Sequence, residues 1–281
     1  MNDTSRSADA QPSVTARTSW RSALSVYLEP ATLRMLFLGF SAGLPLLLVL
    51  GTLSFRLREA GIDRSTIGFL SWVGLAYGFK WVWSPLVDRL PLPLLHRLLG
   101  RRRSWLVLAQ CGVIVGLVGM ALTDPSDALQ TMVSWALVVA FASATQDIAL
   151  DAFRIESADT QHQAALAATY QTGYRLAMIW SGAGVLWIAA WVAGTPSTDY
   201  QQWAWQCAYL CMAASMGLGL ITVMVSPEPI TPALTPARSV RQWLQDALMA
   251  PFAEFLQRYR WQAVLILALI AVYRISDVVM G

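Results

Sequence analysis

The sequence predicts an all-α, polytopic membrane protein built as a bundle of transmembrane helices, and three observations carry this prediction. Hydrophobic residues make up 56% of the chain and charged residues only 13%, against roughly 25% charged residues in a soluble domain. The mean hydropathy is +0.49, and apolar residues in this number exceed what one soluble core can bury. The 281 residues suffice for roughly seven or eight spans of about 20 residues with their connections.

Apolar runs of spanning length recur along the chain and define the expected elements. Residues 1–32 are polar and lack the apolar run of a signal sequence, so we expect a disordered cytosolic tail. Residues 226–261 open with four prolines and continue as an amphipathic stretch, which predicts a cytosolic linker. We expect a six-helix bundle within 33–225 and an incomplete seventh helix over 262–281, with spans at about 33–55, 66–87, 104–122, 129–152, 164–193, 204–225 and from 262.

The basic residues outside these spans are distributed on one side. The tail, the second and fourth loops and the linker carry nearly all of them, whereas the opposite loops carry only Arg56, Arg58 and Arg64. Because Lys and Arg in short loops are retained in the cytoplasm, we expect a cytoplasmic N-terminus.

Three basic residues lie inside predicted spans, where a charge is costly unless it is paired or hydrated. Lys80, the single lysine, lies near a span end, so snorkelling to the headgroups and a cavity role are both open. Arg175 and Arg274 lie near the midplane of their spans. We therefore expect these two to line a polar cavity or to form ion pairs within the bundle.

The end of the fourth span is interrupted by polar residues. Asp147, Asp151 and Arg154 follow at i, i+4 and i+7, so they share one helix face. A carboxylate on such a face can pair with a cation of a neighbouring helix and couple its protonation to the opening of the bundle. A static network of ion pairs that holds the bundle closed is the alternative. Gln146 and Glu156 complete the polar set.

Small residues in two spans predict close helix packing. Gly39 and Gly43 are four residues apart in the first span and precede Pro45, and Gly182 lies in the fifth span. Glycines at this spacing let a neighbouring backbone approach closely.

The sequence contains no motif typical of an enzyme or of a metal site, and its charge does not suggest nucleic-acid binding. The two histidines, His96 and His162, lie in predicted loops, and there is no His-Glu-x-x-His motif, nucleophile elbow or glycine-rich phosphate loop. The basic run Arg101–Arg103 could attract anionic lipid, but a solvated topological anchor explains it better. We expect no catalytic residues, no metal and no cofactor.

The loop after the second span resembles the signature loop of the major facilitator superfamily. It carries Asp88-Arg89 and then Gly100-Arg101-Arg102-Arg103, although Ser84 stands where the superfamily has glycine and residues 90–99 intervene. Further stretches are similar to the AmpG-type muropeptide permeases, and the resemblance covers about residues 33–281. These stretches are Gly39–Pro45, Glu59–Asp63, Thr66–Gly68, Pro85–Arg89, Gly100–Trp105, Ala144–Asp147 with Asp151 and Arg154, Gly173–Arg175 with Ser181-Gly182, and Tyr273-Arg274 with Asp277.

The resemblance implies a transporter fold with an N-terminal six-helix bundle and proton-coupled import of anhydro-muropeptides across the bacterial inner membrane for cell-wall recycling. The implied partners are an anionic small-molecule substrate, the proton, the lipid bilayer and a missing C-terminal bundle of the same transporter. Each polar site residue then has an expected role. The substrate-binding set is Gln146, Tyr174, Arg175 and Arg274; the proton-coupling set is Asp147, Asp151 and Asp277; the gate set is Lys80, Asp88, Arg89, Arg101, Arg102, Arg154 and Glu156.

Two other readings stay open. The chain could be a related permease for another anionic solute, such as a siderophore or an acyl-coenzyme A, or a membrane protein with an interaction role and no transport. The family needs two bundles for alternating access, so we expect the 281 residues to be about half of a transporter, inactive alone.

Overall fold

The computed structural model describes residues 25–157, 162–194, 200–229 and 250–280, and every regular element in these ranges is helical. Five helices among them are long and apolar enough to cross a membrane. This confirms the predicted fold class of a helical membrane bundle. These helices span Pro30–Glu59, Arg101–Leu122, Leu129–Glu156, Gln163–Ala193 and Gln202–Val225.

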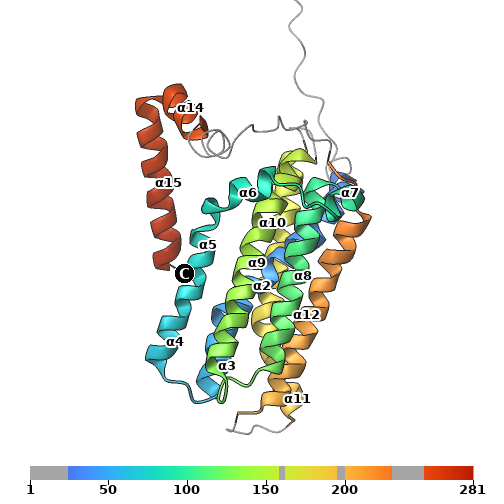
Figure 1. Cartoon of the computed structure of the whole chain (residues 1–281), viewed down its shortest axis with the longest axis vertical. Helices are drawn as coiled ribbons and strands as arrows, with labels where there is room; N and C mark the ends of the chain where they lie inside the picture. The colour runs from blue at the N-terminus through green and yellow to red at the C-terminus, as the bar shows by residue number, and fades with distance from the viewer. Residues whose placement is uncertain (1–24, 158–161, 195–199, 230–249, 281) are drawn as a thin grey trace, which may run out of the picture.

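The long helices stand side by side in one bundle (Figure 1). The first is α2 (Pro30–Val49) continued by α3 (Gly51–Glu59), and it packs against α10 (Gln163–Ile179). The second and third, α8 (Arg101–Leu122) and α9 (Leu129–Glu156), pack against each other, and α12 (Gln202–Val225) packs against α8. α11 (Val185–Ala193) continues α10 beyond a π-helical turn, Trp180–Gly184.

Two apolar clusters fill the bundle. One includes Leu48, Val113 and Met212 and lies toward the end that contains Arg56, called the Arg56 end below. The other includes Leu38 and Phe153 and lies toward the end that contains Arg102, called the Arg102 end below. Because every long helix contributes buried apolar residues, the five spans form one packed unit.

The predicted second span is not an unbroken helix, which corrects that expectation. Residues 64–89 form three short helices joined by two 3-10 turns. Glycines at positions 68, 74 and 78 and Pro85 favour such breaks, and large side chains such as Trp72 and Trp81 are exposed instead of packed. The pieces are α4 (Arg64–Leu70), Ser71–Gly74, α5 (Leu75–Gly78), Lys80–Val82 and α6 (Ser84–Arg89).

Asp63 marks the start of this segment. Its carboxylate accepts hydrogen bonds from the Ser65 hydroxyl and from the backbone N–H (2.9 Å) and hydroxyl (2.6 Å) of Thr66. This is the N-cap arrangement that satisfies the first amides of α4. The donated hydrogen bonds, that of Ser65 first, hold the pKa of Asp63 well below its usual range.

The last helices follow residues that lie outside the described ranges. α14 (Ala250–Tyr259) falls within the predicted linker, and α15 (Trp261–Met280) begins after Arg260, whose φ is 43°. The described side chains of α15 are nearly all exposed, including Leu265 and Leu269. The predicted tail residues 1–24 and linker residues 230–249 lie outside the described residues.

Candidate functional site

An ion pair joins residues 64–89, the broken second span, to α9. Lys80 Nζ lies 3.5 Å from Asp147 Oδ2, and the two side chains are 38% and 18% exposed. Snorkelling to the headgroups and a cavity role were both open for Lys80. In the structure its ammonium lies beside the Asp147 carboxylate of α9. The second oxygen of Asp147, Oδ1, is buried and has no hydrogen-bond partner among the described residues.

Trp83 positions Lys80 against α9. Its indole N–H donates to Thr145 Oγ1 at 3.2 Å, and its ring packs on Phe141 with centroids 5.2 Å apart. These contacts attach the turn after Lys80 to α9 at positions two and six residues before Asp147. Neither Trp83 nor Thr145 was expected from the sequence to have a role.

The face of α9 that was predicted from spacing continues toward the Arg102 end. Arg154 Nη2 lies 3.4 Å from Asp151 Oδ1 in the same helix, and the Arg154 guanidinium lies over the ring of Tyr170 at 5.3 Å. The ring of Tyr170 is in turn 6.2 Å from that of Tyr174. The shared face of α9 therefore contacts α10 through the Arg154 guanidinium on the Tyr170 ring.

The residues predicted to bind substrate are separated. Arg175 is exposed on α10, and its Nη1 lies 4.0 Å from the Met178 sulfur. Gln146 is fully buried inside the bundle, so it could reach a substrate only after a rearrangement. Arg274 and Asp277 fall in α15, but their side chains lie outside the described residues.

A second charged cluster, the Arg102 cluster, joins three segments at the Arg102 end and consists of Asp88, Arg101, Arg102 and Glu156. Arg102 Nη1 lies 2.7 Å from Asp88 Oδ1, and its Nη2 lies 2.6 Å from Glu156 Oε1. Arg101 lies 3.7 Å from Glu156. Arg89 ends α6 directly after Asp88. The predicted gate residues therefore lie in three places: Lys80 beside Asp147, Arg154 beside Asp151 and Tyr170, and the others around Arg102.

Glu228 extends the Arg102 cluster and was missed from the sequence. Its carboxylate accepts hydrogen bonds from the backbone N–H of Arg102 (2.7 Å) and of Arg103 (3.1 Å). A carboxylate there satisfies the free amides and the positive dipole end of α8. Arg103 also joins the start of α8 to the end of α12. Its Nε and Nη2 donate to the carbonyls of Val223 (2.9 Å) and Met224 (2.6 Å).

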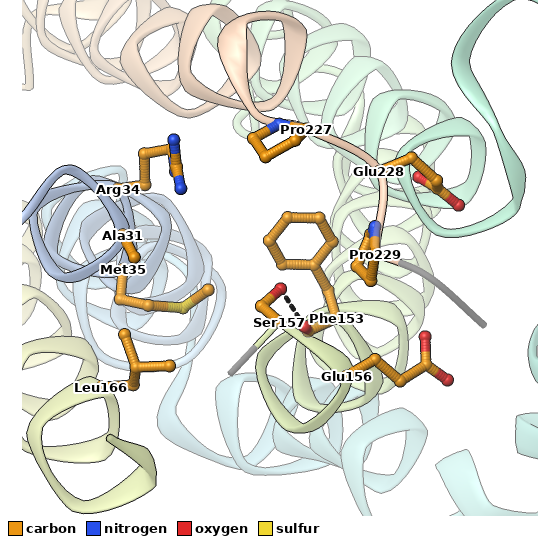
Figure 2. A pocket seen from close by; sticks show the side chains of 10 residues that line it. All are labelled: Ala31, Arg34, Met35, Phe153, Glu156, Ser157, Leu166, Pro227, Glu228 and Pro229. Carbon is orange, nitrogen blue, oxygen red and sulfur yellow. Dashed lines mark hydrogen bonds between the residues drawn. The ribbon is translucent and has the colours of Figure 1, made fainter. Parts of the chain in front are cut away.

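A pocket of about 380 Å³ lies beside this cluster. Figure 2 shows Phe153 near its middle, with Arg34 on one side and the carboxylates of Glu156 and Glu228 on the other. The pocket thus offers separated charges of both signs around an aromatic ring. Its lining is Ala31, Arg34, Met35, Phe153, Glu156, Ser157, Leu166, Pro227, Glu228 and Pro229.

Arg56 lies at the opposite end, and its expected place in a loop was wrong. It belongs to α3 and is fully buried. Its guanidinium donates to the carbonyls of Met120 (2.8 Å) and Thr123 (2.7 Å) at the end of α8, and to Gln202 Oε1 (2.7 Å). It also lies over the ring of Tyr209 at 5.2 Å. A cation at the negative dipole end of α8 fixes α3 to α8 and α12.

The glycines predicted for packing fall into two groups. A methyl group on Gly39 or Gly43 would collide with the backbone carbonyl of Tyr170 or Tyr174, so α2 and α10 touch backbone to backbone. Gly182 differs, because a methyl group there would meet Leu47 at an ordinary 3.5 Å. The close contact in the fifth span is made instead by Gly173 against the Leu36 carbonyl.

Comparisons with known proteins find similarity to proteins described as transporters or permeases. A family model described as acetyl-coenzyme A transporter 1 matches residues 32–127. The chain is 38% identical over 255 residues to the anhydromuropeptide permease of Escherichia coli K12, an alignment that covers 90% of this chain and 48% of the relative. It is 32% identical over 245 residues to the putative transporter AmpG 4 of Rickettsia felis, covering 87% of this chain and 56% of the relative. The chain therefore spans about half the length of these relatives.

Proposed function

Since this chain is a homologue of the AmpG-type permeases, we propose that it forms the N-terminal half of a transporter for anhydro-muropeptides. The chain is a multi-pass membrane protein, as its five apolar helices indicate. We propose that it lies in the bacterial inner membrane with a cytoplasmic N-terminus, because the described basic residues Arg97 and Arg101–Arg103 lie at the Arg102 end. The second bundle would come from the half of the relatives that this chain does not match.

The observation that supports transport most directly is the Lys80–Asp147 pair. An ion pair within an apolar bundle is costly, and such pairs mark substrate or ion pathways in membrane proteins. Lys80 and Asp147 come from different segments, at 3.5 Å, so a motion of residues 64–89 against α9 would separate them. Protonation of Asp147 would release Lys80, and this exchange would couple proton entry to the motion.

Substrate recognition would use the face of α10 beside this pair. Arg175 is exposed there and Tyr174 is half-buried. A guanidinium suits the carboxylates of a peptide substrate, and a phenol suits sugar hydroxyls. We propose that Arg274 and Asp277 of α15 complete the substrate and proton sites, and that the Arg102 cluster acts as the inner gate.

The test is uptake of radiolabelled anhydro-muropeptide by cells that express the complete protein. We expect Asp147→Asn and Arg175→Ala each to abolish uptake with normal amounts of protein in the membrane. The matched controls, Asp127→Asn and Arg58→Ala, alter exposed residues away from the site and should leave uptake intact. Normal uptake by both site variants would overturn these roles.

Proton coupling has a separate measurement. In weakly buffered vesicles, addition of the muropeptide should alkalinise the external medium when protons enter with the substrate. We expect Asp147→Asn to remove this pH change. Uptake that continues unchanged after a protonophore collapses the proton gradient would contradict symport.

A second candidate substrate class follows from the match to the acetyl-coenzyme A transporter model. An acyl-coenzyme A is also anionic, and the same Arg175 could bind its phosphates. Competition decides between the two: excess acetyl-coenzyme A should not reduce muropeptide uptake if the first assignment is right, and concentrative uptake of labelled acetyl-coenzyme A would favour the second.

A further inference from the structure

The centre of the bundle contains a cluster of uncharged polar side chains that is separate from the charged sites. It consists of Ser41 of α2, Gln110 of α8 and Gln146 of α9, and all three side chains are fully buried. Three helices thus each bring one uncharged polar group to the same place. A buried polar group is expected to have hydrogen-bond partners.

The hydrogen bonds within this cluster fix the orientation of both amides. The Ser41 hydroxyl donates its proton to the Leu38 carbonyl at 2.8 Å. Its oxygen accepts from Gln110 Nε2 at 3.3 Å and from Gln146 Nε2 at 3.1 Å. Since the hydroxyl proton is already donated, turning either amide around would bring two acceptor oxygens together.

Both amide oxygens are then left without a donor. Gln110 Oε1 and Gln146 Oε1 are buried and have no hydrogen-bond partner among the described residues. α12 passes directly beside the cluster, but it does so at Gly219, where a methyl group would collide with Ser41. No side chain at that position can supply the missing proton donors.

We propose that this cluster binds water inside the bundle, with the water protons donated to Gln110 Oε1 and Gln146 Oε1. Water is small, carries two donors and commonly satisfies buried amide oxygens that the protein leaves unpaired. A metal cation is a poorer fit, because the oxygen of Ser41 already accepts two hydrogen bonds and few other ligands remain.

This assignment gives Gln146 a role apart from the substrate. Gln146 and Asp147 are neighbours in α9, and their side chains diverge by about 100° around the helix. Bound water on the Gln146 side would tie α9 to α2 and α8, while Asp147 on the other side pairs with Lys80. The Lys80 segment could then move while α9 keeps its place.

Solid-state NMR of the 281-residue chain in lipid bilayers tests the proposal, with glutamine labelled at the side-chain carbonyl carbon. We expect polarisation transfer from water protons to Gln110 and Gln146, and the Gln110→Met and Gln146→Met variants assign the two signals. Gln130, which is exposed at the start of α9, is the positive control for contact with water. No transfer to either buried amide, in a sample where Gln130 responds, would overturn the proposal.

A high-resolution map of the complete transporter provides the second measurement. The expected result is a separate peak at about 2.7–3.2 Å from Gln110 Oε1 or Gln146 Oε1, unchanged when sodium chloride is replaced by rubidium chloride. A peak that grows with rubidium would overturn water in favour of a cation. Amide oxygens found paired with protein donors, with no peak between them, would overturn it as well.

Discussion

At the scale of single residues, the charges inside the bundle are stabilised in different ways. Asp147 has an opposite charge at 3.5 Å, whereas Arg56 has neutral acceptors and an aromatic ring. A guanidinium that donates to several carbonyls keeps all of its bonds only in one geometry. Arg56 therefore acts as a fixed joint, and the Lys80–Asp147 pair is the separable contact.

We expect Arg56→Met to lower the free energy of unfolding by about 2–4 kcal/mol, because hydrogen bonds from a charged donor contribute most when they are buried. The measurement is thermal unfolding in detergent followed by tryptophan fluorescence. Arg58→Met is the control, since Arg58 is exposed two residues further along α3 and its replacement should shift the transition little. Equal losses in the two variants would contradict the role given to Arg56.

The sequence predicted some of these residues and not others, for physical reasons. Lys80 and Asp147 were found because a charge inside an apolar run is conspicuous. Arg56 was assigned to a loop because it lies near a span end, where basic residues usually face solvent. Glu228 was missed because its partners are backbone amides 126 and 125 residues away in sequence, and no local pattern marks such a bond.

At the scale of elements, apolar runs correctly predicted the five long helices. An apolar run also predicted a continuous second span, but residues 64–89 form a broken helix. A run of apolar residues predicts burial in lipid, but glycine spacing and neighbouring helices decide whether the helix stays unbroken. The first and fifth spans also contain irregularities, a break at Leu50 and the π-helical turn Trp180–Gly184. Thr52 Oγ1 donates to the Ser181 carbonyl at 2.8 Å and joins the two.

The α2–α10 contact gives a matched pair of glycine variants in one span. Gly173→Ala should destabilise the protein by about 1–3 kcal/mol, because the added methyl group meets the Leu36 backbone, which cannot yield without moving α2. Gly182→Ala should be neutral or slightly stabilising, since its methyl group fits beside Leu47. Melting temperatures of the two variants measure the difference, and a larger loss for Gly182→Ala would contradict this packing.

The start of α8 should depend on Glu228. Replacing it by alanine removes the acceptor of two backbone amides, so we expect faster hydrogen exchange at Arg102 and Arg103 by about tenfold, which corresponds to roughly 1.4 kcal/mol of lost capping. Mass spectrometry of peptides that contain residues 100–106 measures this exchange.

Glu254→Ala is the control for this exchange experiment, because it removes a carboxylate from an exposed position of α14. Unchanged exchange in Glu228→Ala would show that water replaces the carboxylate at no cost.

At the scale of the whole molecule, the two ends of the bundle differ in how they are held. At the Arg102 end, ion pairs join α6, α8 and α9, and such pairs can exchange partners. At the Arg56 end, the joint uses carbonyls and side-chain amides with fixed geometry. In the two-bundle transporter proposed above, this asymmetry would direct movement to the Arg102 end.

The orientation of the chain is the last prediction, and it follows from the distribution of basic loops. His96 precedes α8 and Asp127 follows it, and both are exposed. With the cysteines Cys111, Cys207 and Cys211 replaced by serine, a membrane-impermeant maleimide should label Asp127→Cys in intact cells and His96→Cys only after permeabilisation, because α8 crosses the bilayer with the basic end inside. The reverse pattern would place the N-terminus outside, and labelling of both positions in intact cells would show that α8 does not span the membrane.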